Sequence, residues 1–319
     1  MDKSARIYVA GHRGLAGSAI LRCLEAQGYS NFALRTHAEL DLTDQRAVRD
    51  FFQKERTEYV FLAAGKVGGI LANNSFPAEF SYINLAIEMN VLHAAWEAGV
   101  KRLLFLGSSC IFPRDCPQPM KEEYLLTGPL EATNRPYAVA KIAGIEQCWA
   151  YNRQYQTRYL AAQPTNLYGP GDHYDLANSH VLPALIRKIH EAKASGAAEF
   201  VVWGTGRPLR EFLYSEDMAD AVVFLMELPE ERFAPLVAAA ACPLINVGYG
   251  EELSIAELAK TAAEVIGYQG RIRFDTAKPD GTPRKLLDSS RLLALGWRPK
   301  VGLKEGIARA YADFRQRFA

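Results

Sequence analysis

This sequence has few cysteines and no excess of either charge. Its 319 residues include only five cysteines, an odd and scattered set without a C-x-x-C pair: Cys23, Cys110, Cys116, Cys148 and Cys242. This pattern argues against a disulfide framework or a structural zinc site, so we expect reduced thiols and no metal site. The 37 Lys and Arg residues balance 36 Asp and Glu residues, so we expect no nucleic-acid partner.

Long apolar runs are also missing, because none approaches the roughly 20 residues of a membrane span. The first residues, MDKSARIYVAG, pass from a short charged lead directly into a strand pattern, unlike a signal peptide. We therefore expect a cytoplasmic protein without a membrane partner.

Short β-branched and aromatic runs alternate with helix-length segments through the first half of the chain. The runs are RIYVA (6–10), YVFLAA (59–64), RLLFLGSS (102–109) and RYLAAQP (158–164), and helical stretches such as 17–27 and 80–98 lie between them. This alternation is typical of βαβ units. We predict an α/β fold with a Rossmann-type doubly wound parallel sheet.

After PTNLYGPGD (164–172) the alternation of strands and helices becomes less regular, because Pro and Gly clusters interrupt the elements at WGTGRP (203–208) and KPDGTPRK (278–285). We predict a smaller C-terminal α/β domain, in which Ser254 and Glu257 form a capping box and residues 303–318 form a helix. The stretch 210–228 and the strand 244–248 are expected to return to the first domain. The first domain then comprises 1–166 with segments near 210–248, and the second comprises 167–209 and 249–319.

A glycine-rich turn follows the first strand directly. The segment GHRGLAG spaces its glycines by three residues before a helix. Without side chains, the backbone can turn tightly and approach a pyrophosphate, which then lies at the helix N-terminus. We predict a dinucleotide site formed by Gly11, His12, Arg13, Gly14, Leu15, Ala16 and Gly17.

The second strand predicts which dinucleotide binds. An NAD site usually has an acidic residue at the end of this strand, but NFALRTH ends with Arg35 and no carboxylate. Arg35 and Arg13 can clamp a 2′-phosphate, which favours NADP(H); the alternative is that they are solvated surface charges. The segment AELDL adds Asp41 and Leu42 as an edge contact and a wall for the adenine.

A tyrosine and a lysine in YAVAK lie four residues apart, on one face of a helix. Free tyrosine has a pKa of about 10, and an adjacent ammonium lowers that pKa by stabilising the phenolate. Lys141 can also hold the nicotinamide ribose. Ser108 or Ser109, at the end of the strand upstream, could share a substrate carbonyl with Tyr137. Taken alone, the pair could also be an exposed helix pair without a function.

These motifs resemble the extended branch of the short-chain dehydrogenase/reductase superfamily, which acts on nucleotide sugars. More specifically, the chain resembles the GDP-L-fucose synthase family in GHRG, AAGKVGGILANN (63–74), GSSCIFP (107–113), RPYAVAKIAG (135–144), PTNLYGP (164–170), NSHVLPALIRK (178–188), VVWGTG (201–206), REF (210–212) and KPDGTPRKLLD (278–288). It departs from the family at Gly65, where alanine is frequent. It also departs at His37, where some members have arginine, so either His37 or Arg35 could contact the 2′-phosphate.

The resemblance implies that the chain is an NADP-dependent oxidoreductase with epimerase activity. The implied substrate is GDP-4-keto-6-deoxy-D-mannose. Epimerisation at carbons 3 and 5 and NADPH-dependent reduction at carbon 4 would give GDP-L-fucose. A homodimer is also implied, and the helices near 80–98 and 137–154 could pair across its two-fold axis.

The same resemblance implies catalytic roles for Ser108, Tyr137, Lys141, Cys110 and His180. A carbonyl polarised by Ser108 and Tyr137 acidifies the protons on both flanking carbons, and inversion needs an acid on one face and a base on the other. A thiol with a pKa near about 8.5 exchanges protons close to neutrality. We expect Cys110 two residues beyond Ser108, on the same side of a strand; without the resemblance, a buried inert cysteine is favoured. His180, with a pKa near about 6.5, is the second acid/base.

Binding residues follow from the resemblance as well. The implied cofactor contacts include Ala63, Ala64, Lys141, Pro164, Asn166, Leu167 and His180. The implied GDP-sugar contacts are Asn166, Lys188, Trp203, Arg210 and Asp280. Lys188 stands where the family often has arginine, so a two-pronged phosphate contact becomes a point charge.

Two alternatives stay open. One is a GDP-4-keto-3,6-dideoxy-sugar epimerase/reductase of the colitose type, which would use the same residues but invert only carbon 5. The other is a redox sensor that binds NADP without turnover. Such a sensor would not need the proton-transfer groups of Ser108, Cys110, Tyr137 and Lys141.

Overall fold

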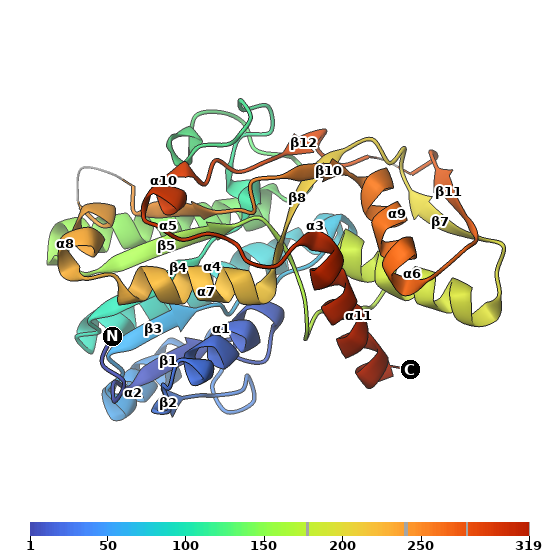
Figure 1. Ribbon diagram of the computed structural model, residues 1–319. Helices are drawn as coiled ribbons and strands as arrows, with labels where there is room; N and C mark the ends of the chain where they lie inside the picture. Colours follow the sequence, from blue (N-terminus) through green and yellow to red (C-terminus); the bar gives the residue numbers. More distant parts are fainter. Residues whose placement is uncertain (177–178, 239–241, 279, 319) are drawn as a thin grey trace.

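A six-stranded parallel sheet forms the larger part of the computed structural model, which describes residues 1–176, 179–238, 242–278 and 280–318 (Figure 1). The strand order is β2-β1-β3-β4-β5-β9, and each neighbouring pair is parallel. The strands are β1 (Ile7–Ala10), β2 (Phe32–Ala33), β3 (Tyr59–Leu62), β4 (Arg102–Leu106), β5 (Tyr159–Pro164) and β9 (Leu244–Val247). The predicted doubly wound sheet is confirmed.

Helices cover both faces of this sheet because successive strand residues point to opposite sides. From β1, Tyr8 packs toward the layer of α2 (Gln45–Glu55), α4 (Pro77–Glu97) and α5 (Arg135–Tyr155). Its neighbour Ile7 packs toward the layer of α1 (Leu15–Ala26) and α7 (Ser215–Glu227). The carboxyl ends of the strands therefore form one open edge between two helical layers.

A smaller unit lies beyond this edge, on the right in Figure 1. In it, β8 (Leu209–Tyr214) pairs with β6 (Asn166–Tyr168), β10 (Glu252–Ser254) and β12 (Arg284–Lys285). A second, two-stranded sheet joins β7 (Glu199–Trp203) to β11 (Arg271–Asp275). The helices of the unit are α6 (Val181–Ser195), α9 (Ile255–Ile266) and α11 (Leu303–Phe318). Ser254 and Glu257 form the predicted capping box at the start of α9.

The chain crosses between the two units several times. The connections are β5 to β6, β8 to α7, β9 to β10, and β12 to α10 (Ser290–Ala294), which packs beside β9. The chain then returns to the smaller unit between α10 and α11. The sequence stretch 210–228, expected to return as a whole, divides at this boundary. Its first part is β8, whose backbone hydrogen bonds are satisfied within the smaller unit, and only α7 lies on the six-stranded sheet.

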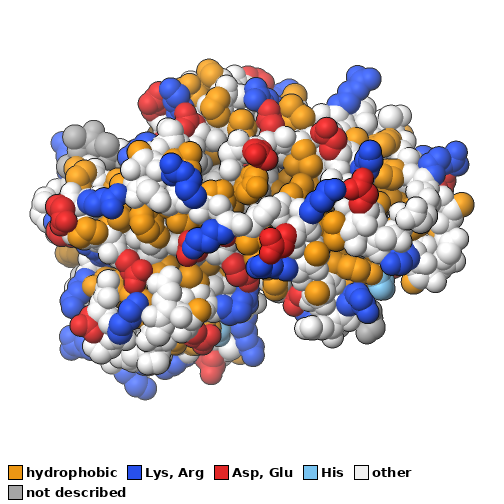
Figure 2. All heavy atoms as spheres, in the orientation of Figure 1, with side chains coloured by type: hydrophobic (Ala, Val, Ile, Leu, Met, Phe, Trp, Pro, Cys, Tyr) orange, Lys and Arg blue, Asp and Glu red, His pale blue; other side chains and the backbone are white. Residues whose placement is uncertain are grey.

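Several short elements complete the fold: α3 (Ile70–Ser75), α8 (Glu230–Phe233) and three 3₁₀ turns at Ser109–Ile111, Glu122–Tyr124 and Ala234–Leu236. Within the described ranges, no helix combines the length and apolar character needed to cross a membrane. Figure 2 shows positive and negative side chains interspersed over the visible face, as the balanced composition predicts.

Candidate active site

The glycine turn after β1 is built so that backbone atoms fill the space where side chains would be. Gly11 has φ +81°, and a Cβ on Gly17 would lie 2.1 Å from the Gly11 carbonyl oxygen. Gly14 begins α1 without a side-chain cap, which leaves the first N–H groups of that helix available to an anion. Nδ1 of His12 is buried without a hydrogen-bond partner in the structure. This cradle fits a dinucleotide pyrophosphate.

The two arginines expected around a 2′-phosphate differ in their surroundings. Arg13 is exposed within the glycine turn. Arg35 pairs with Glu55, with Nη2 2.5 Å from Oε1, and donates to the carbonyl of Leu34 at 2.7 Å. The pairing partner was missed because Glu55 lies at the end of α2, far along the chain. His37 is exposed, and its Nδ1 lies 3.9 Å from Oδ1 of Asp41.

The remaining residues expected at the cofactor lie along the carboxyl edge of the sheet. Leu42 is buried, whereas Asp41 is exposed and accepts from the backbone N–H and the hydroxyl of Thr43, which lower its pKa. Ala63 and Ala64 follow β3 and contact the glycine turn, since a Cβ on Gly11 would meet Ala64. Pro164 ends β5 and Leu167 lies in β6.

Ser108 and Cys110 meet through a turn, and the expectation that they share one side of a strand is wrong. β4 ends at Leu106, Ser108 is extended, and a 3₁₀ turn begins at Ser109. The turn folds the thiol back, so that Sγ of Cys110 lies 3.3 Å from Oγ of Ser108. Burial raises the pKa of Cys110, and the nearby charge of Lys285 opposes that shift.

Tyr137 lies beside this pair at the start of α5. Its side chain is buried, and its ring packs edge-on against Phe80 with the centroids 6.1 Å apart. Burial raises the pKa of the phenol, while a hydrogen bond with Ser108 lowers it. The structure thus brings Ser108, Cys110 and Tyr137 together, as the sequence predicts.

Lys141 lies on the same helix face as Tyr137 but its ammonium points elsewhere. Nζ is 3.2 Å from Oε1 of Glu88 and donates to the Leu106 carbonyl at 3.1 Å. It is 6.0 Å from the centroid of the Tyr137 ring. The expected lowering of the Tyr137 pKa by Lys141 is therefore not seen in this structure, since the ammonium pairs with Glu88, a residue that the sequence reading missed.

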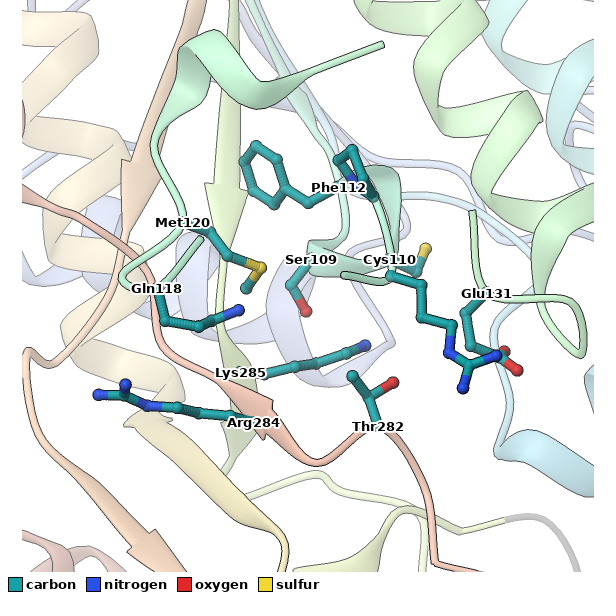
Figure 3. A pocket seen from close by; sticks show the side chains of 11 residues that line it. Ser109, Cys110, Phe112, Gln118, Met120, Glu131, Thr282, Arg284 and Lys285 are labelled. Carbon is teal, nitrogen blue, oxygen red and sulfur yellow. The ribbon is translucent and has the colours of Figure 1, made fainter. Parts of the chain in front are cut away.

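Two side chains of the smaller unit lie near this group, Lys285 beside Cys110 and His180 near Lys285. His180 precedes α6. Its pKa is lowered mainly by burial and also by the charge of Lys285. Lys285, in β12, lines a small cavity together with Ser109, Cys110 and Thr282. Figure 3 shows it extending across that cavity. Lys285 lies within the segment KPDGTPRKLLD, but the sequence does not indicate it as a site residue. Only the fold places β12 near the turn that carries Cys110.

The residues expected to hold the nucleotide form a second group in the smaller unit. Nζ of Lys188 lies 5.0 Å from the ring centroid of Trp203, which is 54% exposed. Asp280 accepts from the backbone N–H and hydroxyl of Thr205, and its charge acts on Arg210. Burial lowers the pKa values of Lys188 and Arg210, because desolvation disfavours the charged form.

Asn166 lies between the two groups and donates from Nδ2 to the Glu211 carbonyl at 2.7 Å. Two positions of the segments quoted above, Asn178 and Pro279, lie outside the described residues. Lys285 connects the two groups, because its charge acts on Cys110 and the charge of Arg210 acts on Lys285.

Comparison with known proteins gives a consistent result. Residues 7–238 match the model of the NAD dependent epimerase/dehydratase family. GDP-L-fucose synthase 1 of Arabidopsis thaliana is 56% identical over 97% of this chain and 93% of its own length. GDP-L-fucose synthase of Escherichia coli (strain K12) is 54% identical over 97% of this chain and 96% of its own length.

Two further proteins bear on substrate and cofactor. GDP-L-colitose synthase of Yersinia pseudotuberculosis is 37% identical over 97% of both chains. The solved structure of MlghC, a GDP-mannoheptose C4 reductase from Campylobacter jejuni with NADP bound, is 38% identical, has a TM-score of 0.90 and covers 99% of each chain. The identity is thus higher to the two GDP-L-fucose synthases named above than to the GDP-L-colitose synthase, while another GDP-L-fucose synthase, from Azorhizobium caulinodans, is 36% identical.

Proposed function

Because this chain belongs to the NAD dependent epimerase/dehydratase family, we propose that it converts GDP-4-keto-6-deoxy-D-mannose into GDP-L-fucose. It does so as an NADP-dependent epimerase and reductase. The observation that carries this proposal is the cluster of a thiol and two hydroxyls at the end of β4 and the start of α5. Sγ of Cys110 lies 3.3 Å from Oγ of Ser108, and Ser108 is hydrogen-bonded to Tyr137.

NADP(H) is the cofactor, and the glycine cradle of residues 11–17 holds its pyrophosphate against the N-terminus of α1. Arg13 and Arg35 contact the 2′-phosphate, and Asp41 and Leu42 border the adenine. Ala63, Ala64, Lys141, Pro164, Asn166, Leu167 and His180 line the path toward the nicotinamide. When bound, the reduced cofactor supplies the hydride for carbon 4.

Ser108 and Tyr137 bind the carbonyl oxygen at carbon 4. As negative charge builds on that oxygen, the Ser108 hydroxyl donates a hydrogen bond to it and Tyr137 transfers its proton. The buried position of Tyr137 raises its pKa and keeps the phenol protonated until that moment. The same two donors stabilise an enolate, which makes the protons on carbons 3 and 5 removable.

Cys110 and His180 carry those protons, one as base and the other as acid. They reach the sugar from different units, Cys110 from the turn after β4 and His180 from the start of α6. In this proposal the two residues act on opposite faces of the carbon, as inversion requires. Lys285 stabilises the thiolate of Cys110, because its charge lowers the pKa that burial raises.

The GDP part of the substrate occupies the smaller unit, and the cofactor occupies the six-stranded unit. Trp203 stacks on the base and Asp280 accepts from a ribose or guanine donor. Lys188 and Arg210 pair with the phosphates, which offsets the cost of burying their charges. Asn166 lies where the two ligands meet.

The protein works as a cytoplasmic homodimer in this proposal. Apolar side chains that would otherwise face water lie on α4 and α5: Tyr82, Met89, Val139 and Tyr155 are 68%, 57%, 47% and 40% exposed. Contiguous exposed apolar surface marks interaction sites, and in this proposal these side chains belong to one such surface. Pairing of α4 and α5 across a two-fold axis would bury them.

The proposal is tested by mixing purified protein, NADPH and GDP-4-keto-6-deoxy-D-mannose and identifying the product by NMR. We expect GDP-L-fucose with consumption of one NADPH per product. A parallel reaction with the 3-deoxy substrate tests the colitose type. Faster turnover of the 3-deoxy sugar, or no turnover of either sugar, would contradict the proposal.

A further inference from the structure

Lys141 is held by the buried carboxylate of Glu88, which has no role in the reaction proposed above. The side chains of Lys141 and Glu88 are only 5% and 1% exposed, and Nζ lies 3.2 Å from Oε1. The ammonium also donates to the carbonyl of Leu106 and lies 4.6 Å from the centroid of the Phe105 ring. The charge is therefore fixed between α4, α5 and the end of β4.

The helix opposite makes room for this carboxylate. A Cβ on Gly144 of α5 would lie 2.9 Å from Oε2 of Glu88 and 2.7 Å from the Phe105 ring. Apart from the ion pair, neither carboxylate oxygen of Glu88 has a hydrogen-bond partner in the structure. Glu88 thus depends on Lys141 for its stabilisation, and Lys141 depends on Glu88 for its position.

Stability alone does not explain such a pair. Taking two charges out of water costs as much as their attraction returns, and apolar replacements are often equally stable or more stable. Polar groups placed in a core at this cost are expected to have another role. Here the ion pair adjoins the proton donor proposed for reduction.

We propose that Glu88 is a positioning residue for Lys141. Its carboxylate holds the ammonium against the end of β4 and, through its own charge, sets how readily Tyr137 gives up its proton. This inference rests on the reduction proposed above.

The electrostatics around Glu88 support this role. Burial raises its pKa to about 7, and Lys141 opposes the shift. The other titratable groups on which its charge acts are Tyr137 and Cys148, both on α5. On its β4 side are the Phe105 ring and the Leu106 carbonyl, neither of which titrates.

A charged Glu88 raises the pKa of Tyr137. When Glu88 takes up a proton, its negative charge no longer opposes ionisation of Tyr137, and the phenol becomes a stronger acid. Hydride transfer is then expected to accelerate as the pH falls through about 7.

The test compares Glu88→Gln with Glu88→Asp and with Glu97→Gln, a matched control on the same helix whose carboxylate pairs with Arg49 at 3.1 Å. Single-turnover reduction of the 4-keto sugar is followed from pH 6 to 8. In wild type and Glu97→Gln the rate should fall about threefold to tenfold over this range. In Glu88→Gln the fall should vanish, and Glu88→Asp should restore it. A wild-type profile in Glu88→Gln would overturn the inference.

A second measurement needs no turnover and covers the case in which Glu88→Gln folds poorly. Thermal unfolding of Glu88→Gln, Lys141→Met and the double variant is measured at pH 8. Each single change leaves a buried group without its partner, so we expect the double variant to be more stable than the sum of the single effects predicts. Additive effects would show that the two residues do not act on one another. If wild type did not reduce the sugar but the coupling were found, the proposed reaction would fail while the pairing held.

Discussion

Sγ of Cys110 lies 3.3 Å from Oγ of Ser108, which places a titratable thiol beside the hydroxyl proposed to hold the substrate carbonyl. The two side chains have different roles in the proposed reaction, so their effects on its two steps can be measured separately. Reduction needs Ser108, Tyr137 and the cofactor, whereas epimerisation also needs a group that exchanges protons near neutral pH.

Cys110→Ser is therefore expected to fold and bind NADPH but to lose most epimerisation. Exchange of the carbon 3 and carbon 5 hydrogens with heavy water should fall by about 10²–10⁴, the range for a positioned acid or base. Proton NMR of the substrate with enzyme and oxidised NADP measures this exchange without reduction. His180→Gln should behave similarly. Wild-type exchange in Cys110→Ser would make Cys110 a buried thiol without a catalytic role.

Tyr137→Phe keeps the ring packing against Phe80 but removes the proton donor. We expect the rate of ketone reduction to fall by about 10²–10⁴. NADPH affinity, measured by fluorescence titration, should stay within about threefold of wild type, since folding and the glycine cradle are unaffected. Near-normal reduction would refute the role given to Tyr137.

The cofactor preference has a salt-dependent test. If Arg13 and Arg35 contact a 2′-phosphate, NADPH binds more tightly than NADH, and the difference shrinks as salt is added. Arg13→Ala should weaken NADPH about tenfold or more and leave NADH unchanged. Arg35→Ala should show the same selectivity with a small added loss of stability, because it removes one of the two arginines that pair with Glu55, the other being Arg6. Equal affinities for the two nucleotides in wild type would contradict the assignment.

Lys285 provides a pH-dependent test of the thiol. Its charge lowers the Cys110 pKa, so Lys285→Met should raise that pKa and move the part of the exchange profile that reports thiol ionisation to higher pH. At a fixed pH below that range, less thiolate is present. Lys121→Met, which removes an exposed lysine, serves as the control. If the pH dependence of exchange in Lys285→Met were the same as in wild type, the ammonium would not act on Cys110.

Glu88 makes a prediction about stability. Its pKa rises from 4.5 to about 7 in the folded chain, so the folded state binds the proton more tightly than the unfolded state. Its contribution to stability is therefore complete below about pH 4.5 and is lost as the pH rises through about 7. The free energy of unfolding of wild type relative to Glu88→Gln should fall by about 2–3 kcal/mol between pH 5 and 8. Urea titrations at several pH values measure it, and a constant difference would be inconsistent with the raised pKa.

The fold was largely predictable because its determinants are local. Buried strands such as β3 and β4 are short apolar runs, the glycine turn directly follows β1, and α9 carries its own capping box. Residues of one motif, such as Tyr137 and Lys141, share a helix face by spacing alone. These features do not depend on where distant segments pack.

The site contacts that the sequence does not predict are those that depend on tertiary packing. The partners of Arg35 and Lys141 are Glu55 and Glu88, and neither can be identified until α2 and α4 are placed on the sheet. The 3₁₀ turn that brings Cys110 to Ser108 interrupts what reads as one continuous strand. Lys285 reaches the same place only because β12 pairs with β8.

The repeated crossings of the chain between its two units limit how those units can move. A protease cut in any one of the connections β5 to β6, β8 to α7, β9 to β10, β12 to α10 or α10 to α11 would leave the other four intact. The two units of such a molecule cannot be expressed as separate fragments of continuous sequence. Because several connections join the two units side by side, the motion that they allow is bending about these connections. Limited proteolysis followed by size-exclusion chromatography should therefore give nicked chains that still elute as one intact particle.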